Sequence, residues 1–247
     1  MIDTHAHIHF DQYKDQLDEV LNRTKEAGVG KIITVGVDEP DSQKAVDCAR
    51  SYQNVFASVG IHPHEAKAGI GRIAELIGEK VVAIGECGLD YYRNLSPKDD
   101  QIKVFRAQIE LALEHDLPLI FHVREAYEDF QEIIKDYPQA RGVIHSFNAD
   151  AKTAAPLVEL GFYFGLNGIM TFTKDSAQLE AAKLIPLNQL LLETDCPFLS
   201  PVPHRGKVNE PANIPVIAKF LAELRGESME ELAKATTANA NQLFSLD

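Results

Sequence analysis

Apolar residues gather along this chain in short runs that alternate with longer stretches of mixed polarity. The runs are almost continuously apolar, which is typical of strands that are covered on both faces. Glycine and proline residues punctuate the joins between the two kinds of segment. The pattern predicts eight strands, at residues 2–5, 31–36, 55–60, 81–86, 117–122, 142–145, 162–165 and 190–193.

The stretches between the predicted strands have the periodicity of helices. Residues 11–27 and 101–115 each carry apolar side chains three or four positions apart, so that these side chains share one face. Two more helices are predicted near the end of the chain, at residues 214–224 and 229–243. Residues 196–210 are the least regular stretch, with three prolines and a glycine, and we expect a long loop there.

A strand followed by a helix, repeated about eight times, implies a parallel sheet with right-handed crossovers. Eight such units in 247 residues favour an α/β fold closed into a (β/α)8 TIM barrel. The competing fold, a doubly wound open sheet, normally has a glycine-rich turn after its first strand, but that turn here is HAHIHFDQY. Because no linker interrupts the pattern, we predict a single domain over residues 1–247.

Composition narrows the range of partners. The chain has 24 lysines and arginines against 37 aspartates and glutamates, a formal charge of −13. This disfavours adhesion to nucleic acid or anionic lipid over a broad surface, but it permits a local phosphate site that uses metal ions. Three widely spaced cysteines indicate reduced thiols. With no basic and apolar leader and no apolar run near about 18 residues, we expect a cytoplasmic protein without a membrane anchor.

Five of the predicted strands end in, or run into, side chains that bind metal ions. In a barrel the carboxyl ends of all strands open onto one mouth, where active sites lie. A single histidine or acid at a strand end is usually a cap or a solvated residue, but buried charges at five ends are costly unless they are paired or bound to metal. The candidate ligands are His5, His7, Glu86, His122, His145 and Asp195.

Six ligands exceed the three that a catalytic zinc ion commonly takes from a protein, and they suit two divalent ions. Two such ions can stabilise the attacking and leaving oxygens of a displacement, which indicates hydrolysis of a phosphate ester or, less specifically, of another ester or an amide. The mixture of nitrogen and oxygen ligands permits zinc, manganese or magnesium.

Seven segments stand out, in this order along the chain: DTHAH (3–7), GIHPH (60–64), GECGLDYY (85–92), FHVREA (121–126), HSF (145–147), ETDCPFL (193–199) and RGKVNEP (205–211). Taken together, they resemble the TatD family of metal-dependent deoxyribonucleases. The resemblance extends over the whole chain. It implies an amidohydrolase-like barrel that binds two divalent cations and hydrolyses DNA phosphodiesters, often as a 3′–5′ exonuclease.

The resemblance also implies a role for each candidate ligand. His5 and His7 would bind the first ion together with Asp195, and Glu86 would be the carboxylate that bridges the two ions. The second ion would be bound by His122 and His145. Asp195 would in addition be the general base that takes a proton from the attacking water, so Asp195 and Glu86 are the predicted catalytic residues.

Several other residues are expected on the substrate side. His62 and His64 match a pair that follows the third strand in the family, although a solvated loop position is an equal alternative for His64. Tyr91, Tyr92 and Arg124 are expected to line the mouth of the barrel, with a packing role as the alternative for Tyr92.

Arg205 and Lys207 lie in the irregular loop, close in sequence to the ligand Asp195. Arginine is well suited to phosphate, so we expect contact with substrate; the alternative is a salt bridge between Arg205 and Glu210. Two such cations could hold a strand end but could not coat a long duplex. We therefore expect DNA ends or single-stranded DNA as the substrate and no obligate protein partner.

Two further functions remain open at this point. The same ions could cleave a carboxylic ester or an amide, as in a D-aminoacyl-tRNA deacylase, because fold and metals do not determine the substrate. A barrel that only holds a partner is disfavoured by the intact set of ligands. Cys87 and Cys196 are expected to be buried packing residues, and His9, two positions past the first strand, is expected to lie in a loop or to support the ligands.

Overall fold

The computed structural model of the chain describes residues 1–246. All eight predicted strands are present, and their order in the sheet is their order in the chain. They are β1 (Ile2–Ala6), β2 (Lys31–Val35), β3 (Val55–Val59), β4 (Val81–Asp90), β5 (Leu119–Arg124), β6 (Gly142–Ile144), β7 (Tyr163–Leu166) and β8 (Leu190–Leu192).

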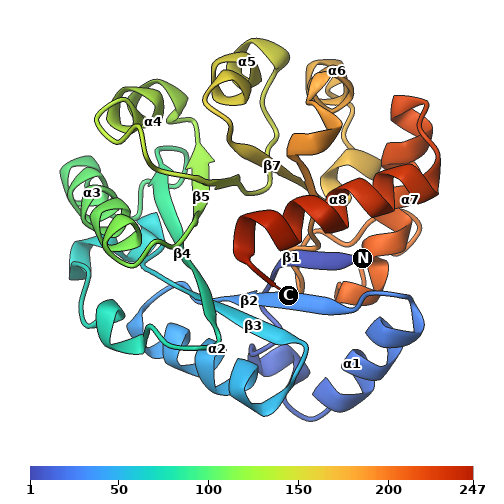
Figure 1. The fold of residues 1–247 in the computed structure, drawn as a ribbon, viewed down its shortest axis with the longest axis horizontal. Coiled ribbons are helices and arrows are strands. Elements are labelled where there is room, and N and C mark those ends of the chain that lie inside the picture. The colour runs from blue at the N-terminus through green and yellow to red at the C-terminus, as the bar shows by residue number, and fades with distance from the viewer. Residues whose placement is uncertain (247) are drawn as a thin grey trace. The chain divides into compact units, whose positions relative to one another are not determined.

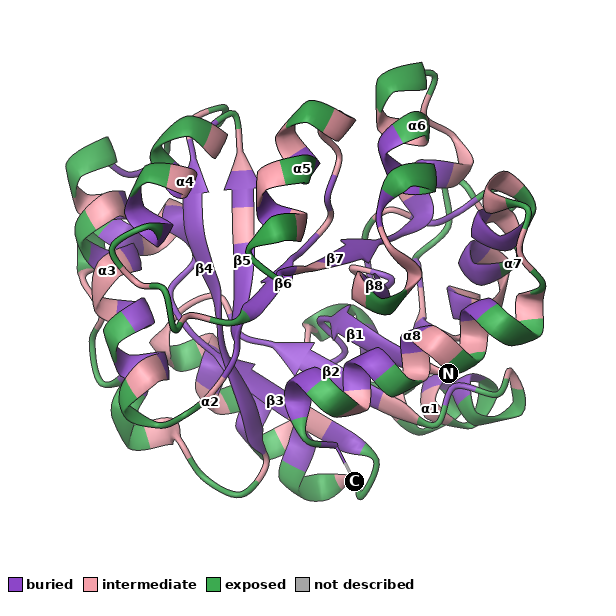
Figure 2. Cartoon of the chain, turned by 45° about the horizontal axis from the view of Figure 1, so that its top comes forward, coloured by how far each residue is buried: buried purple, intermediate pink, exposed green. Residues whose placement is uncertain are grey.

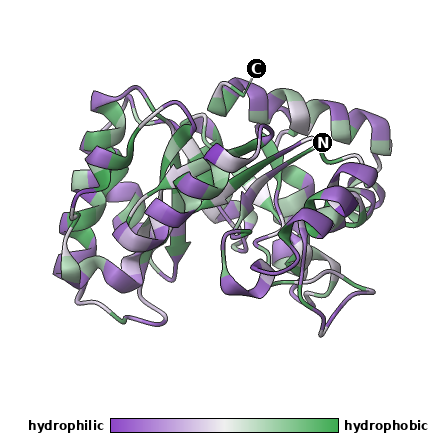
Figure 3. Ribbon diagram, turned by 90° about the horizontal axis from the view of Figure 1, so that it is seen from below, coloured by the Kyte–Doolittle hydropathy of each residue, from purple (hydrophilic) through white to green (hydrophobic). Residues whose placement is uncertain are grey.

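An α-helix follows each strand as predicted, except after β3, where only the 3-10 turns Pro63–Ala68 and Ile73–Leu76 precede β4. Four of the helices begin at an aspartate or serine whose side chain accepts a backbone N–H. Hydrophilic and hydrophobic residues alternate along them, as expected for helices that cover a sheet (Figure 3). They are α1 (Leu17–Glu26), α2 (Glu39–Ser51), α3 (Lys98–Glu114), α4 (Tyr127–Ile134), α5 (Ala151–Glu159), α6 (Ser176–Leu184), α7 (Ile214–Arg225) and α8 (Met229–Phe244). Among residues 1–246, no helix has both the length and the apolar character needed to cross a membrane.

The residues form two compact units. The first unit comprises Met1–Ile33 and Ser146–Asp247, and the second comprises Thr34–His145. The first unit thus contains early elements such as β1 and late ones such as α8, drawn in blue and red in Figure 1. The prediction of a single domain stays a prediction.

The second unit is built on four strands, β3 to β6, that pair in parallel. Phe105 of α3, Phe121 of β5 and Phe130 of α4 meet in its core, with ring centroids 5.1 to 5.9 Å apart. All three side chains are fully buried, and burial of each stabilises the fold by about 1.5–3 kcal/mol. The core therefore fastens α3 and α4 to the strand that carries His122.

In the first unit, β7 and β8 pair in parallel, and Ala6 at the end of β1 bridges to Cys196. Helix α8 covers this part of the sheet, where the Asn239 amide donates hydrogen bonds to the carbonyls of Leu187 and Leu190 at 2.8 and 2.9 Å. β1 and β4 are buried along their full length (Figure 2). The metal-binding residue types on these two strands are thus held by rigid structure.

The strand and helix boundaries differ from the predicted ones at two places that matter. β4 does not end at Glu86 but continues to Asp90. The first helix begins at Leu17 and not at residue 11, because Asp11–Tyr13 form a separate 3-10 turn. Tyr13 is buried there, and its hydroxyl donates a hydrogen bond to the Asn209 carbonyl. The long loop at residues 196–210 is confirmed, since it contains neither helix nor strand.

Candidate metal centre

Three candidate ligands lie together in the first unit. His5 and His7 alternate along the chain at the end of β1, so their rings point to the same side, and their Nε2 atoms are 3.3 Å apart. The Asp195 carboxylate lies 3.7 Å from His5 Nε2 and 3.4 Å from His7 Nε2. The His5 side chain is fully buried, whereas 16% of the Asp195 side chain remains exposed. Two imidazoles and one partly accessible carboxylate therefore converge, as a divalent ion requires.

A buried carboxyl group, which the sequence did not single out, fixes the segment that carries Asp195. Asp3 Oδ1 accepts a hydrogen bond from the Thr194 N–H at 2.9 Å, and Asp3 Oδ2 accepts one from the Thr194 hydroxyl at 2.5 Å. Burial raises the pKa of Asp3 to about 7, although the Thr194 hydrogen bonds oppose the shift. The Asp195 N–H donates to the His5 carbonyl at 2.8 Å. β1 therefore positions His5, and His7 directly after it, together with the segment that carries the Asp195 carboxylate.

The remaining candidate ligands lie in the second unit around Glu86. Oε1 of Glu86 is 2.7 Å from His122 Nδ1 and 3.7 Å from His145 Nε2. His62 lies on the other side, with its Nε2 atom 3.5 Å from the same oxygen. Ligand atoms of His62, Glu86 and His122 all lie within 4.8 Å of one another, close enough to hold one ion. His62, expected on the substrate side, is thus beside the candidate ligands.

Asp90 is a buried carboxylate that the sequence analysis missed. It accepts hydrogen bonds from His64 Nε2 at 2.8 Å, from His122 Nε2 at 3.1 Å and from the Arg93 N–H at 2.7 Å. Glu86 and Asp90 have the same parity along β4, so both project from one face. That spacing could have revealed Asp90, had the strand not been predicted to end at Glu86.

Gly88, between these two acids, lies opposite His122 in the register of β4 and β5. A Cβ atom at this position would lie 2.1 Å from the His122 carbonyl oxygen, and the backbone φ is +139°. Only glycine fits this close approach without strain. The register shifts between Ile84 and Cys87, an irregularity of the kind that redirects side chains near functional sites.

Hydrogen bonds and burial set the charges in this cluster. Burial lowers the pKa of His62 to about 4, although Glu86 opposes the shift, so His62 is a neutral imidazole. Burial alone would raise the pKa of Asp90, but the hydrogen bonds from His122, Arg93 and His64 outweigh it and hold the pKa below its usual value. Burial likewise would lower the pKa of His122, yet its bonds to Asp90 and Glu86 raise it. Metal ions bind neutral imidazoles and ionised carboxylates, so His62 and Asp90 already favour the binding form, whereas a metal ion at His122 would have to displace a proton from its ring.

The two cysteines next to the candidate ligands in the sequence are not in a form that binds metal ions. Cys87 and Cys196 are fully buried. Burial raises the pKa of the Cys196 thiol to about 12 and that of Cys87 well above its usual value. Both are therefore neutral thiols, which are poor metal ligands, as expected of packing residues. His9 lies in a turn beyond β1, with its ring 4.9 Å from that of Phe10.

The residues expected on the substrate side of the second unit surround the end of β4. The Tyr91 hydroxyl donates a hydrogen bond to Asp129 at 2.6 Å, and Lys98 Nζ lies 3.8 Å from the centre of the Tyr91 ring. Tyr92 is 56% exposed, and the Arg124 guanidinium lies over its ring at 4.0 Å.

In the first unit, Arg205 is exposed and lies over the Phe172 ring, with Cζ 3.8 Å from the ring centre. It donates a hydrogen bond to the Ser200 carbonyl at 2.9 Å. Glu210 pairs with Arg23 at 2.7 Å, so the alternative of a salt bridge between Arg205 and Glu210 is not what the structure contains. Lys207 is also exposed.

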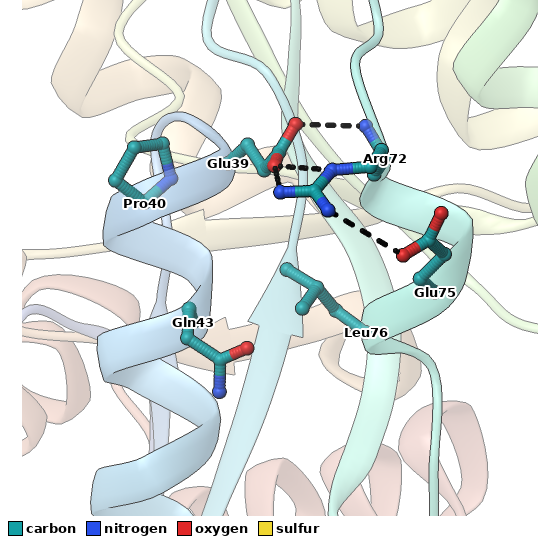
Figure 4. Close-up of a pocket in the computed structure, with 6 residues that line it drawn as sticks. All are labelled: Glu39, Pro40, Gln43, Arg72, Glu75 and Leu76. Atoms are coloured by element: carbon teal, nitrogen blue, oxygen red, sulfur yellow. Dashed lines mark hydrogen bonds and ion pairs between the residues drawn. The ribbon is translucent and has the colours of Figure 1, made fainter.

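A separate pocket lies between α2 and the 3-10 turn Ile73–Leu76 in the second unit (Figure 4). Arg72 crosses it and pairs with Glu39 at 2.8 Å and with Glu75 at 3.9 Å. Its N–H also donates to Glu39 at 2.9 Å. The charges in this pocket are thus already paired with one another, and none of its residues is a candidate ligand.

Sequence comparison decides the family. The profile of the family described as TatD related DNase matches residues 2–245. The chain belongs to the TatD family. A relative from Bacillus subtilis (strain 168), named an uncharacterized metal-dependent hydrolase, is 42% identical over 254 residues and the full length of both chains. A TatD protein of Erwinia amylovora, named a 3′–5′ ssDNA/RNA exonuclease, is 38% identical over 262 residues, again over the full length of both.

The fold agrees with solved TatD structures. The crystal structure of a TatD homologue from Escherichia coli K12 is 31% identical, matches with a TM-score of 0.92, and covers 99% of this chain and 98% of its own. The predicted (β/α)8 barrel is confirmed, and so is the resemblance to the TatD family. The protein is a metal-dependent hydrolase of this family.

Proposed function

We propose that this protein is a nuclease that uses divalent metal ions to hydrolyse DNA phosphodiester bonds, and that it removes nucleotides from the 3′ end. The observation that carries the proposal is the convergence of imidazoles on a carboxylate in each unit, at 3.4 and 3.7 Å around Asp195 and at 2.7 to 3.7 Å around Glu86. The exonuclease named among its TatD relatives supports the choice of substrate and direction.

The donor sets fit divalent ions. In the first unit, His5, His7 and Asp195 would hold one ion; in the second, Glu86, His122 and His145 would hold another, with His62 near enough to take part. Such ions lower the pKa of bound water and stabilise the negative charge that builds up on phosphate oxygens. Zinc, manganese and magnesium remain the candidates, because the ligands are of mixed type.

The protein's own residues would supply the general base and the contacts to substrate. Asp195 combines a fixed backbone with a side chain that is 16% exposed, so it can accept a proton from the attacking water as a general base. Arg205 and Lys207 are exposed cations on the loop that follows Asp195, and they would contact the phosphates of the substrate.

A comparison of two substrates tests this function. The purified protein, loaded with manganese, zinc or magnesium, is incubated with single-stranded DNA labelled at one end and, separately, with aminoacylated RNA. We expect metal-dependent release of nucleotides from the 3′ end, and loss of this activity when a chelator removes the ions. Deacylation of the RNA without any release of nucleotides would instead identify an ester or amide hydrolase.

Asp90 should strengthen metal binding through His122, because it contacts the ring nitrogen that does not face Glu86. His122 directs Nδ1 at Glu86 and Nε2 at Asp90, so one ring nitrogen can face an ion while the other donates to a buried carboxylate. Changing Asp90 to Asn should lower the affinity for manganese or zinc about ten- to a hundredfold, as measured by titration calorimetry. The matched change Asp136→Asn, at a surface carboxylate paired with Arg106, should leave the affinity unchanged. Equal affinities in a folded Asp90→Asn protein would contradict this role.

A further inference from the structure

The arginines of this chain fall into two groups, those that form an ion pair with a carboxylate and those that do not. Six of the nine pair with an aspartate or glutamate: Arg23, Arg50, Arg72, Arg106, Arg141 and Arg225. Among residues 1–246 the other three, Arg93, Arg124 and Arg205, form no ion pair with a carboxylate. The chain has 37 acidic and only 24 basic residues, so an arginine that no carboxylate neutralises is unusual in it. Such an arginine is available to bind an external anion.

Arg124 lies directly beyond the candidate ligands of the second unit. It is two residues after His122 on β5, so both side chains project from one face of the strand, about 7 Å apart along it. The Tyr91 N–H donates to the Arg124 carbonyl at 3.0 Å, which extends the pairing of β4 with β5 past Asp90. A strand end bound at His122 would therefore pass Arg124.

The segment after β4 is aromatic and basic. Residues 91–98 read YYRNLSPK, with two aromatic rings, two cations and no acid. Tyr91 contacts Asp129 and Lys98, whereas Tyr92 is 56% exposed and has the Arg124 guanidinium over its ring, at 4.0 Å. Exposed tyrosine rings and guanidinium planes are the surfaces on which unpaired bases stack in proteins that bind single strands.

We propose that Tyr92 and Arg124 form a stacking platform for an unpaired base of single-stranded DNA. This inference rests on the proposed nuclease function and specifies the form of its substrate. Every base has a flat face, so the platform accepts any sequence, whereas the bases inside a duplex are already stacked and paired. Arg93 and Lys98, on the same segment, supply positive charge for the phosphates on either side of the stacked base.

Binding to a cleavage-resistant strand tests the platform on the metal-loaded protein. The probe is a fluorescent phosphorothioate DNA oligonucleotide of about ten nucleotides, within the range of single-strand site sizes. Tyr92→Ala should raise its Kd about 5- to 150-fold, because stacking contributes about 1–3 kcal/mol per base, while Tyr92→Phe should bind like the wild type. In cleavage assays, Tyr92→Ala should raise KM and leave kcat almost unchanged.

An oligonucleotide with abasic positions separates stacking from phosphate contacts. It should bind the wild-type protein as weakly as the normal strand binds Tyr92→Ala. The matched control is Tyr137, whose ring centre lies 5.7 Å from Arg106, because there the arginine pairs with Asp136 and the Tyr137 hydroxyl donates to Glu110. Tyr137→Ala should leave Kd unchanged.

The failures of the two proposals can be told apart. If the wild-type protein releases nucleotides from DNA but Tyr92→Ala has the same Kd and KM, the platform is wrong and the nuclease proposal stands. Equal weakening by Tyr92→Ala and Tyr137→Ala would also overturn the platform. If the wild-type protein neither binds nor cleaves single-stranded DNA, both proposals are wrong.

Discussion

Changing Asp195 to Asn should reduce the rate of phosphodiester hydrolysis by about 10²- to 10⁴-fold, the usual contribution of a general base. Asparagine has almost the same size as aspartate, but its amide cannot take a proton from water. The neighbouring contacts that shape this segment, from the Asp195 N–H to the His5 carbonyl and from Thr194 to Asp3, do not involve the Asp195 side chain. The fold should therefore persist, as measured by circular dichroism and thermal melting.

The rate is measured as nucleotide release by the metal-loaded protein under single-turnover conditions. Asp47→Asn is a suitable control, because Asp47 is an exposed carboxylate that pairs only loosely with Arg50, at 3.8 Å, and accepts one hydrogen bond from Gln43. Its rate should equal that of the wild type. Turnover by Asp195→Asn at the wild-type rate would refute the role assigned to Asp195.

Changing Gly88 to Ala should lower the free energy of unfolding by about 2 to 6 kcal/mol, the sum of backbone strain and overpacking. The added Cβ would approach the His122 carbonyl oxygen to 2.1 Å, and the residue would have to keep a φ of +139°. β5 must move to relieve this contact, and it carries His122. Urea denaturation, followed by fluorescence or circular dichroism, measures the loss.

Gly161→Ala is the matched control for strain alone. Gly161 also has a positive φ, of +81°, but nothing lies within 4 Å of the Cβ position. Its substitution should cost only about 1–2 kcal/mol, the penalty for the left-handed conformation. If both variants lose the same stability, the close approach of β4 to β5 does not limit what residue 88 can be.

The sequence predicts the barrel well because each strand coincides with a short apolar run. The apolar pattern does not reveal the full length of β4. Its last five residues include Gly88 and Asp90, which interrupt the pattern, although the strand continues there and pairs with β5. The first helix was predicted too long for a different reason. Tyr13 is drawn into the core and bonded to Asn209, a contact across 196 positions that local periodicity cannot contain.

The candidate site was predicted in part. The alternation of His5 and His7 and the acid at position 195 indicate a shared cluster, and the structure brings these three side chains together. The support from Asp3 through Thr194 and from Asp90 to His122 was not predicted, because it depends on which strands are neighbours. The assignment of each residue to an ion or to catalysis stays a prediction.

The short segment at residues 91–97 joins β4 to α3 without contributing a candidate ligand of its own. Connections of this kind tolerate replacement more readily than the strands they join, and in barrel enzymes they are where relatives diverge. If the proposed platform is right, exchanging residues 91–95 between family members should change the affinity for a single strand and leave the affinity for metal ions unchanged. Ser96 is excluded from such an exchange, because its buried hydroxyl donates to the His64 carbonyl at 2.7 Å and accepts from the Lys67 N–H at 3.1 Å. Substrate preference and metal binding could then vary independently within one fold.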